Sequence, residues 1–128
     1  MEKSMRALVV DDSRAIREII GNMLKELGYQ VFEAGHGKDA LKQLSTNGAM
    51  ELAMVDWNMP EMNGYEFVCA ARGDKSYDAM RIVMVTTETE ISQTVKALEA
   101  GANEYIMKPF TKDIVKEKLA LLGLASIS

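Results

Sequence analysis

The stretch LAMVDWNMPEMNG, residues 52–64, contains a complete connection from a strand to a helix. Its first four residues form an apolar run that is typical of a buried strand, and the run ends abruptly on the carboxylate of Asp56. Turn-forming residues at 59–64 then lead into a helix that Asn63 can cap. The stretch therefore predicts a buried strand that ends on an acid, and other parts of the chain must supply the reason for that acid.

Four further units of a strand followed by a helix are predicted, two before this stretch and two after it. Strands are predicted over residues 6–10, 30–34, 52–55, 82–85 and 104–107. The helix caps and stops are expected to be Ser13, Asn63 and Thr111 at N-termini and Gly28 and Gly101 at C-termini. Alternation with short connections indicates an α/β fold in three layers: a five-stranded parallel sheet with helices on both faces, forming one domain over residues 1–128.

Apolar residues at helical spacing mark the helices. In the first helix they are Ile16, Ile19, Ile20, Met23, Leu24 and Leu27, and in the fourth they are Ile91, Val95 and Leu98. In the last helix we expect Ile114, Val115, Leu119 and Leu122 to point inward. Cys69 lies on an apolar helix face and is expected in the core.

Composition and charge exclude several classes of protein. The chain has 128 residues, 48% of them hydrophobic, which suits one domain with one packed core. Its net charge is −4 without a basic patch, so nucleic-acid binding is not expected. A single cysteine fits a reducing compartment, and no apolar run has membrane-spanning length, so we expect a cytoplasmic protein without membrane insertion.

Polar residues follow four of the five predicted strands directly. Asp11 and Asp12 follow the first, Asp56 the third, Thr86 the fourth and Lys108 the fifth. Because parallel strands all end at one edge of the sheet, these side chains should converge there. Three converging carboxylates must take up protons or bind a cation, and a site of oxygen ligands suits Mg²⁺. With a lysine and a hydroxyl beside them, they predict a phosphoryl-transfer site in which a carboxylate attacks in line.

Four motifs in order carry a resemblance to a known family. They are VVDDS at 9–13, DWNMPEMNG at 56–64, VTTE at 85–88 and YIMKPFT at 105–111. Together they resemble the bacterial response-regulator receiver domain, and within that family the single-domain chemotaxis type (the CheY type), over nearly the whole chain. The resemblance implies a flavodoxin-like (βα)5 fold with strand order 2-1-3-4-5, an order that the residues themselves do not establish.

The resemblance also implies roles for the converging residues. Asp56 would be the phosphoryl acceptor. Asp12, Asp56 and the backbone carbonyl of Asn58 would bind Mg²⁺ directly, and Asp11 would hold a metal-bound water. Lys108 would pair with Asp56 and then with the phosphoryl group. The family implies a cis Lys108–Pro109 bond, although local sequence alone favours trans.

The remaining implied roles concern the response to phosphorylation. Thr86 would move its hydroxyl onto the phosphoryl group, and Tyr105 would rotate inward in response. Asn58 and Glu88 would tune the rate of self-dephosphorylation. The partner-binding surface would include Ile91, Thr94, Tyr105 and Lys118.

The function expected from these roles is a monomeric, phosphorylation-activated signalling switch. A histidine kinase would be the phosphodonor, a flagellar motor component the target and a phosphatase a further partner. The chain would catalyse its own phosphorylation and dephosphorylation without being an enzyme in the usual sense. The alternatives are a phosphate sink for the kinase and a receiver domain from a larger regulator.

Two other classes fit the sequence poorly. An aspartyl-phosphate phosphohydrolase of the haloacid dehalogenase kind needs a nucleophile in an Asp-x-Asp pair, whereas Asp11 and Asp12 are adjacent. A flavodoxin-like electron carrier needs a phosphate-binding loop rich in Ser, Thr and Gly after the first strand, and DDSRAIRE does not provide one.

Overall fold

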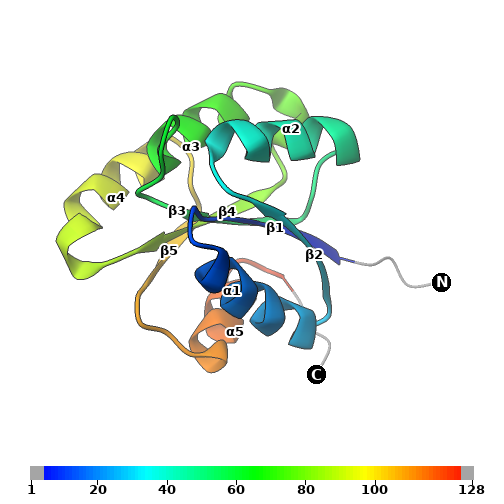
Figure 1. Cartoon of the computed structure of the whole chain (residues 1–128), viewed down its shortest axis with the longest axis vertical. Helices are drawn as coiled ribbons and strands as arrows, with labels where there is room; N and C mark the ends of the chain where they lie inside the picture. Colours follow the sequence, from blue (N-terminus) through cyan, green and yellow to red (C-terminus); the bar gives the residue numbers. More distant parts are fainter. Residues whose placement is uncertain (1–4, 125–128) are drawn as a thin grey trace.

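The computed structural model describes residues 5–124, in which strands and helices alternate along the chain (Figure 1). The strands are β1 (Met5–Val10), β2 (Tyr29–Ala34), β3 (Leu52–Asp56), β4 (Arg81–Thr86) and β5 (Glu104–Met107). The α-helices are α1 (Arg14–Glu26), α2 (Gly37–Asn47), α3 (Gly64–Arg72), α4 (Ile91–Glu99) and α5 (Lys112–Leu121). Two short 3₁₀ turns, η1 (Lys75–Tyr77) and η2 (Glu88–Glu90), precede β4 and α4.

The five strands form one parallel sheet in the order β2-β1-β3-β4-β5. This confirms the flavodoxin-like fold and the strand order that the family resemblance implied. Helices α1 and α5 cover one face of the sheet, and α2, α3 and α4 cover the other (Figure 1). The chain moves from β1 outward to β2 and then returns to β3 on the other side of β1, so the order reverses at β1. In sheets of this kind, ligands bind beyond the strand ends at such a reversal.

The core is divided by the sheet into two apolar layers. In β3, Leu52 and Met54 pack toward α1 and α5, whereas Ala53 and Val55 pack toward α2, α3 and α4. Because both faces of the central strands are covered, every residue of β3 is buried. This explains why the strand sequences are continuously apolar instead of alternating.

The predicted helix caps at Ser13, Asn63 and Thr111 are confirmed. Each side chain accepts a hydrogen bond from a backbone N–H three residues later. Asn63 also forms a reciprocal capping box with Glu66, at 2.9 and 3.0 Å. Helix α2, which the sequence pattern predicts over residues 38–44, begins at Gly37, where the Nδ1 atom of His36 accepts a hydrogen bond from the backbone N–H of Asp39.

Several apolar residues that mark the helices are more exposed than the sequence pattern suggests. Ile19 is 52% exposed and Val95 is 48% exposed. Ile114, expected to point inward, is 38% exposed, and Cys69 is exposed instead of lying in the core. Each helix buries only one stripe against the sheet, so apolar residues beside that stripe stay in contact with solvent.

None of the helices within residues 5–124 is long and apolar enough to cross a membrane. The longest, α1, has 13 residues, against the roughly 20 apolar residues that a bilayer requires.

Gly64 allows the start of α3 to approach the end of β3 closely. Its backbone N–H donates to the carbonyl of Trp57 at 2.9 Å. A Cβ atom at this position would lie 2.7 Å from the Asp56 carbonyl oxygen and 2.7 Å from the Met84 methyl group. The backbone oxygen cannot move aside cheaply, so the connection from Asp56 to α3 depends on the missing side chain.

We predict that Gly64→Ala destabilises the fold by about 1–3 kcal/mol because the added methyl group overpacks this contact. Urea unfolding measures the change. Gly73→Ala is the matched control, since Gly73 has an ordinary helical φ of −77° and its Cβ would meet no atom closer than 3.4 Å. A Gly64→Ala variant as stable as the Gly73→Ala variant would contradict the close approach.

Candidate functional site

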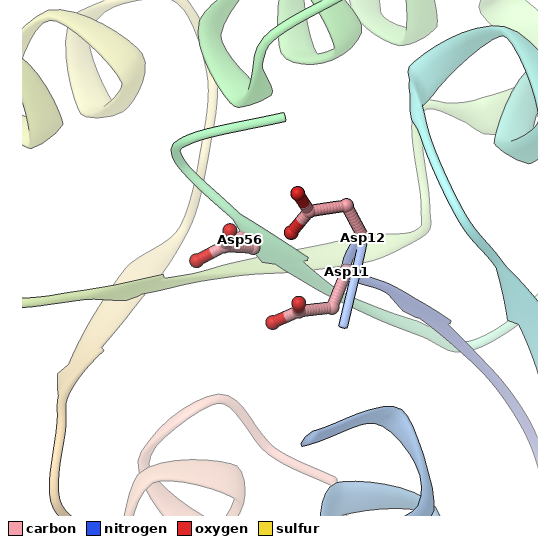
Figure 2. A group of neighbouring side chains, drawn as sticks. All are labelled: Asp11, Asp12 and Asp56. Carbon is pink, nitrogen blue, oxygen red and sulfur yellow. The ribbon is translucent and has the colours of Figure 1, made fainter. Parts of the chain in front are cut away.

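Three acids meet at the carboxyl edge of the sheet, as the sequence predicts. Asp11 and Asp12 follow β1, and Asp56 is the last residue of the neighbouring β3. One carboxylate oxygen from each residue lies within 4.8 Å of the other two. Figure 2 shows the three carboxylates reaching into the same space beyond the strand ends. Asp11 and Asp56 are buried, and Asp12 is exposed, so the cluster is open to solvent on the Asp12 side.

The Asp11 carboxylate is only half satisfied by the protein. Its Oδ1 atom accepts a hydrogen bond from the backbone of Ser13 at 2.8 Å. Its Oδ2 atom is buried and has no hydrogen-bond partner among the described residues. A buried carboxylate oxygen without a partner is costly, and a cation or a cation-bound water would satisfy it.

Lys108 brings one positive charge to the acids. Its Nζ donates to Asp56 Oδ1 at 3.0 Å and lies 3.8 Å from Asp11 Oδ2. Its backbone N–H donates to the carbonyl of Thr86 at 2.7 Å, which fixes the end of β5 beside the end of β4. The Lys108–Pro109 peptide bond is cis, as the family resemblance implied.

The pKa values describe a site with too little positive charge. Burial raises the pKa of Asp56 to about 6; the hydrogen bond from Lys108 opposes this shift, and the charge of Asp11 adds to it. Burial also raises the pKa of Asp11. Burial disfavours the charged form of Lys108, but the hydrogen bond and charge of Asp56, with the charge of Asp11, outweigh it and raise the pKa of Lys108. One ammonium therefore does not compensate three carboxylates.

The donor set of the cluster fits a metal ion. Carboxylate oxygens suit hard divalent cations, and a cation would both relieve the repulsion and satisfy Asp11 Oδ2. Asn58, two residues after Asp56, is exposed in the connection to α3. Its backbone carbonyl belongs to the same short segment as the cluster, but the ligand role of that carbonyl stays a prediction.

Thr86 is fully buried at the end of β4, and its hydroxyl is engaged by its neighbours. The hydroxyl donates to the carbonyl of Thr87 at 3.2 Å and accepts from the hydroxyl of Thr94 at 3.0 Å. The prediction of Thr94 as a surface residue is therefore wrong, because Thr94 is 0% exposed. Helix α4 turns Thr94 and Ala97 toward the sheet and leaves Val95 in solvent. Thr94 and Ala97 are three residues apart and so share one helix face, and this spacing could have predicted that Thr94 faces the sheet.

The other predicted surface residues are only partly exposed. Ile91, Tyr105 and Lys118 are all half-buried. The Lys118 ammonium lies 5.2 Å from the centroid of the Tyr105 ring and 3.5 Å from Glu104 Oε1, so α5 and β5 are joined at this surface. The side chain of Glu88 lies outside the part of the structure that is described.

An apolar groove beside Lys108 was not predicted from the sequence. Its volume is about 380 Å³. It is lined by Ile16, Ile19, Ile20 and Met23 of α1 and by Lys108, Pro109 and Phe110. The available signal was the width of the apolar face of α1, which is broader than one contact with the sheet needs. The groove accounts for the exposure of Ile19.

Comparisons with known proteins agree with this geometry. A family model described as the response regulator receiver domain matches residues 7–120. The chain is 49% identical over 124 residues to a chemotaxis protein CheY homolog of Campylobacter jejuni, covering 95% of both chains. It is 46% identical over 119 residues to chemotaxis protein CheY1 of Helicobacter pylori, covering 92% of this chain and 96% of that one. Among solved structures, CheY4 of Vibrio cholerae matches with a TM-score of 0.85 and 33% identity, over 93% of this chain and 98% of that chain.

The raised pKa of Asp56 predicts how stability depends on pH. The folded chain holds the Asp56 proton up to about pH 6, whereas the unfolded chain releases it near the ordinary value of 3.8. Wild-type stability should therefore fall as the pH rises through this window. Asp56→Asn carries no charge, so without divalent cations it should be more stable than wild type at pH 7.5, by about 1–3 kcal/mol. The gain should shrink toward zero at pH 4.

Urea unfolding of both chains at the two pH values measures this difference. Asp113→Asn, on the exposed first turn of α5, is the matched control and should not stabilise the chain at either pH. Equal stabilities of wild type and Asp56→Asn at pH 7.5 would show that Asp56 carries its charge without penalty.

Proposed function

Because this chain belongs to the response regulator receiver domain family, we propose that Asp56 accepts a phosphoryl group from a histidine kinase. The chain is a CheY-like chemotaxis response regulator receiver, a signalling protein and not a classical enzyme. One observation carries the proposal. The Asp56 carboxylate lies at the sheet edge beside Lys108 and within the cluster formed with Asp11 and Asp12.

The phosphoryl acceptor has to be ionised and accessible to the donor. With a pKa of about 6, Asp56 is largely ionised at neutral pH, yet it is a stronger base than an ordinary carboxylate. In the proposed step an Asp56 oxygen attacks the phosphorus of a phosphohistidine. The P–N bond then breaks, the imidazole leaves with its electron pair, and an acyl phosphate remains on Asp56.

Lys108 stabilises both the reactant and the product of this step. Before transfer its ammonium donates to Asp56 Oδ1 at 3.0 Å. After transfer it donates to a phosphoryl oxygen that occupies the same region. Because the side chain is half-buried, little water competes for this interaction.

The cofactor proposed for this site is Mg²⁺. Asp12, Asp56 and the backbone carbonyl of Asn58 would hold it directly, and Asp11 would hold it through a water. A bound Mg²⁺ supplies positive charge that offsets the charge on the transferring phosphoryl oxygens. The unsatisfied Asp11 Oδ2 atom and the lack of positive charge support this assignment.

The response proposed for phosphorylation begins at Thr86. Its hydroxyl would leave its present partners to donate to a phosphoryl oxygen, and Tyr105 would rotate inward in response. This changes the surface formed by α4, β5 and α5, to which Ile91, Tyr105 and Lys118 contribute. A flagellar motor component is the proposed target, which the chemotaxis names of the relatives support.

Further properties follow from the same assignment. We propose that Asn58 and Glu88 set a rapid self-dephosphorylation, that a phosphatase acts on the phosphorylated form, and that the chain works as a cytoplasmic monomer of one receiver domain. A phosphate sink for the kinase would use the same acceptor, Asp56. It would differ from a signalling switch because its phosphorylated form would not need to bind a target.

Acetyl phosphate with Mg²⁺ should add one phosphoryl group to the chain, and Asp56→Asn should abolish the addition. Intact-protein mass spectrometry measures the product. Asp113→Asn is the control and should be phosphorylated like wild type. If Asp56→Asn gains the group as readily as wild type, Asp56 is not the acceptor.

Mg²⁺ should raise the urea midpoint at pH 7.5 and change the fluorescence of Trp57, because it relieves repulsion beside this half-buried ring. Asp12→Asn should weaken the response by about tenfold or more, since it removes a proposed direct ligand. A flat titration up to millimolar Mg²⁺ would argue against the metal site.

A further inference from the structure

The hydroxyl groups of Thr86 and Thr94 form a buried pair between β4 and α4. Both residues are 0% exposed, and their oxygen atoms lie 3.0 Å apart. We propose that Thr94 is a positioning residue: it holds the Thr86 hydroxyl in its resting place and so sets how readily the phosphoryl site recruits that hydroxyl. The inference rests on the proposed function of Thr86 and deepens it.

The hydrogen atoms available to the pair determine its arrangement. Each hydroxyl has one proton to donate and two lone pairs that accept. The proton of Thr86 goes to the carbonyl of Thr87 at 3.2 Å, so the Thr86 oxygen is the acceptor for Thr94. The Thr86 proton must leave the Thr87 carbonyl before it can reach a phosphoryl oxygen. That movement also takes the Thr86 oxygen away from Thr94.

Thr94 has a second acceptor that does not depend on Thr86. Its hydroxyl lies 3.2 Å from the carbonyl of Glu90, four residues earlier in the chain. Such a bond to the preceding turn is an ordinary arrangement for threonine in a helix. When Thr86 departs, the Thr94 proton stays satisfied by Glu90, so the departure leaves the Thr94 donor paired.

The single proton of Thr94 is shared between two acceptors that differ in their access to water. The bond to Thr86 is buried, whereas the bond to Glu90 is only partly buried. If the Thr94 hydroxyl is removed, water can replace it at the Glu90 carbonyl but not at the Thr86 oxygen. The loss therefore destabilises the resting position of Thr86 more than the recruited position.

The pair is also joined to the segment that connects β4 to α4. The side chain of Glu90 accepts from the backbone of Thr87 at 3.0 Å, and Thr87 in turn accepts the Thr86 proton. Thr86, Thr87, Glu90 and Thr94 thus form a closed hydrogen-bonded ring. A movement of Thr86 opens this ring at two bonds, so α4 is affected directly at its first turn.

The test is the affinity for beryllofluoride, a phosphoryl analogue, at saturating Mg²⁺, followed by Trp57 fluorescence. Thr94→Val keeps the shape of the side chain but removes its hydroxyl, and it should lower the beryllofluoride midpoint by about two- to tenfold, the factor expected for one hydrogen bond. Thr94→Ser restores the hydroxyl and should return the midpoint to within about twofold of wild type. If Thr94→Val does not fold, Thr94→Ala removes the same hydroxyl without a branched side chain.

Two further measurements separate positioning from general loosening of the structure. In a Thr86→Ala background, Thr94→Val should have no effect on the beryllofluoride midpoint, because the partner of the hydroxyl is missing. The Mg²⁺ midpoint without beryllofluoride should be the same in all Thr94 variants. An equal shift in the Thr86→Ala background, or a parallel change in Mg²⁺ affinity, would overturn the inference.

The outcomes also distinguish this inference from the proposed function. An unchanged or higher midpoint in Thr94→Val, while wild type responds and Asp56→Asn does not, overturns the role of Thr94 alone. A wild-type chain that ignores beryllofluoride, or an Asp56→Asn variant that responds like wild type, overturns the proposed function and the inference with it.

Discussion

The hydrogen bond between Lys108 and Asp56 joins two strand ends that are 52 residues apart in the chain. It lies where the fold gathers three like charges, and a single ammonium at 3.0 Å has to offset these carboxylates. Asp56 is buried and Lys108 is half-buried, so the bond is partly shielded from water, and Asp11 and Asp56 are poorly solvated. The charged form of Asp56 is therefore destabilised, chiefly by burial, and its pKa is raised to about 6. Additional positive charge would stabilise the site.

This excess of negative charge can be tolerated because the surrounding scaffold is well satisfied. The central strands are covered on both faces, and the caps at Ser13, Asn63 and Thr111 satisfy helix starts beside the site. In these elements local preferences and overall topology agree, as expected when a stable scaffold supports a functional site that is less stable by itself. The proposed cation would gain binding energy from the excess negative charge at the sheet edge, and with Lys108 it would offset the charge that a phosphoryl group adds.

The sequence predicted the strands, the caps and the convergence of the acids, because each follows from a short local pattern or from parallel topology. The strand order was not available in this way: it came from the resemblance to a family, since apolar strands do not encode their neighbours. The orientation of α4 was predicted wrongly. Val95 is more apolar than Thr94, yet Thr94 is buried because its hydroxyl has the partners Thr86 and Glu90. Whether a polar residue can face inward depends on contacts across the fold, which a helical pattern does not contain.

Because side chains alternate along each strand, the proposed phosphoryl acceptor and the residue proposed to respond to it face opposite sides of the sheet. Asp56 continues the series Leu52 and Met54, which faces α1 and α5, whereas Thr86 continues the series Ile82 and Met84, which faces the layer of α4. In the proposed mechanism a covalent bond made by a residue of one series is therefore first detected by a residue of the other series, which faces the opposite side of the sheet. The strands need not slide or separate for this. The Thr86 hydroxyl at the carboxyl edge of the sheet would couple the two faces. The packing of the sheet and its core would not have to change for this coupling.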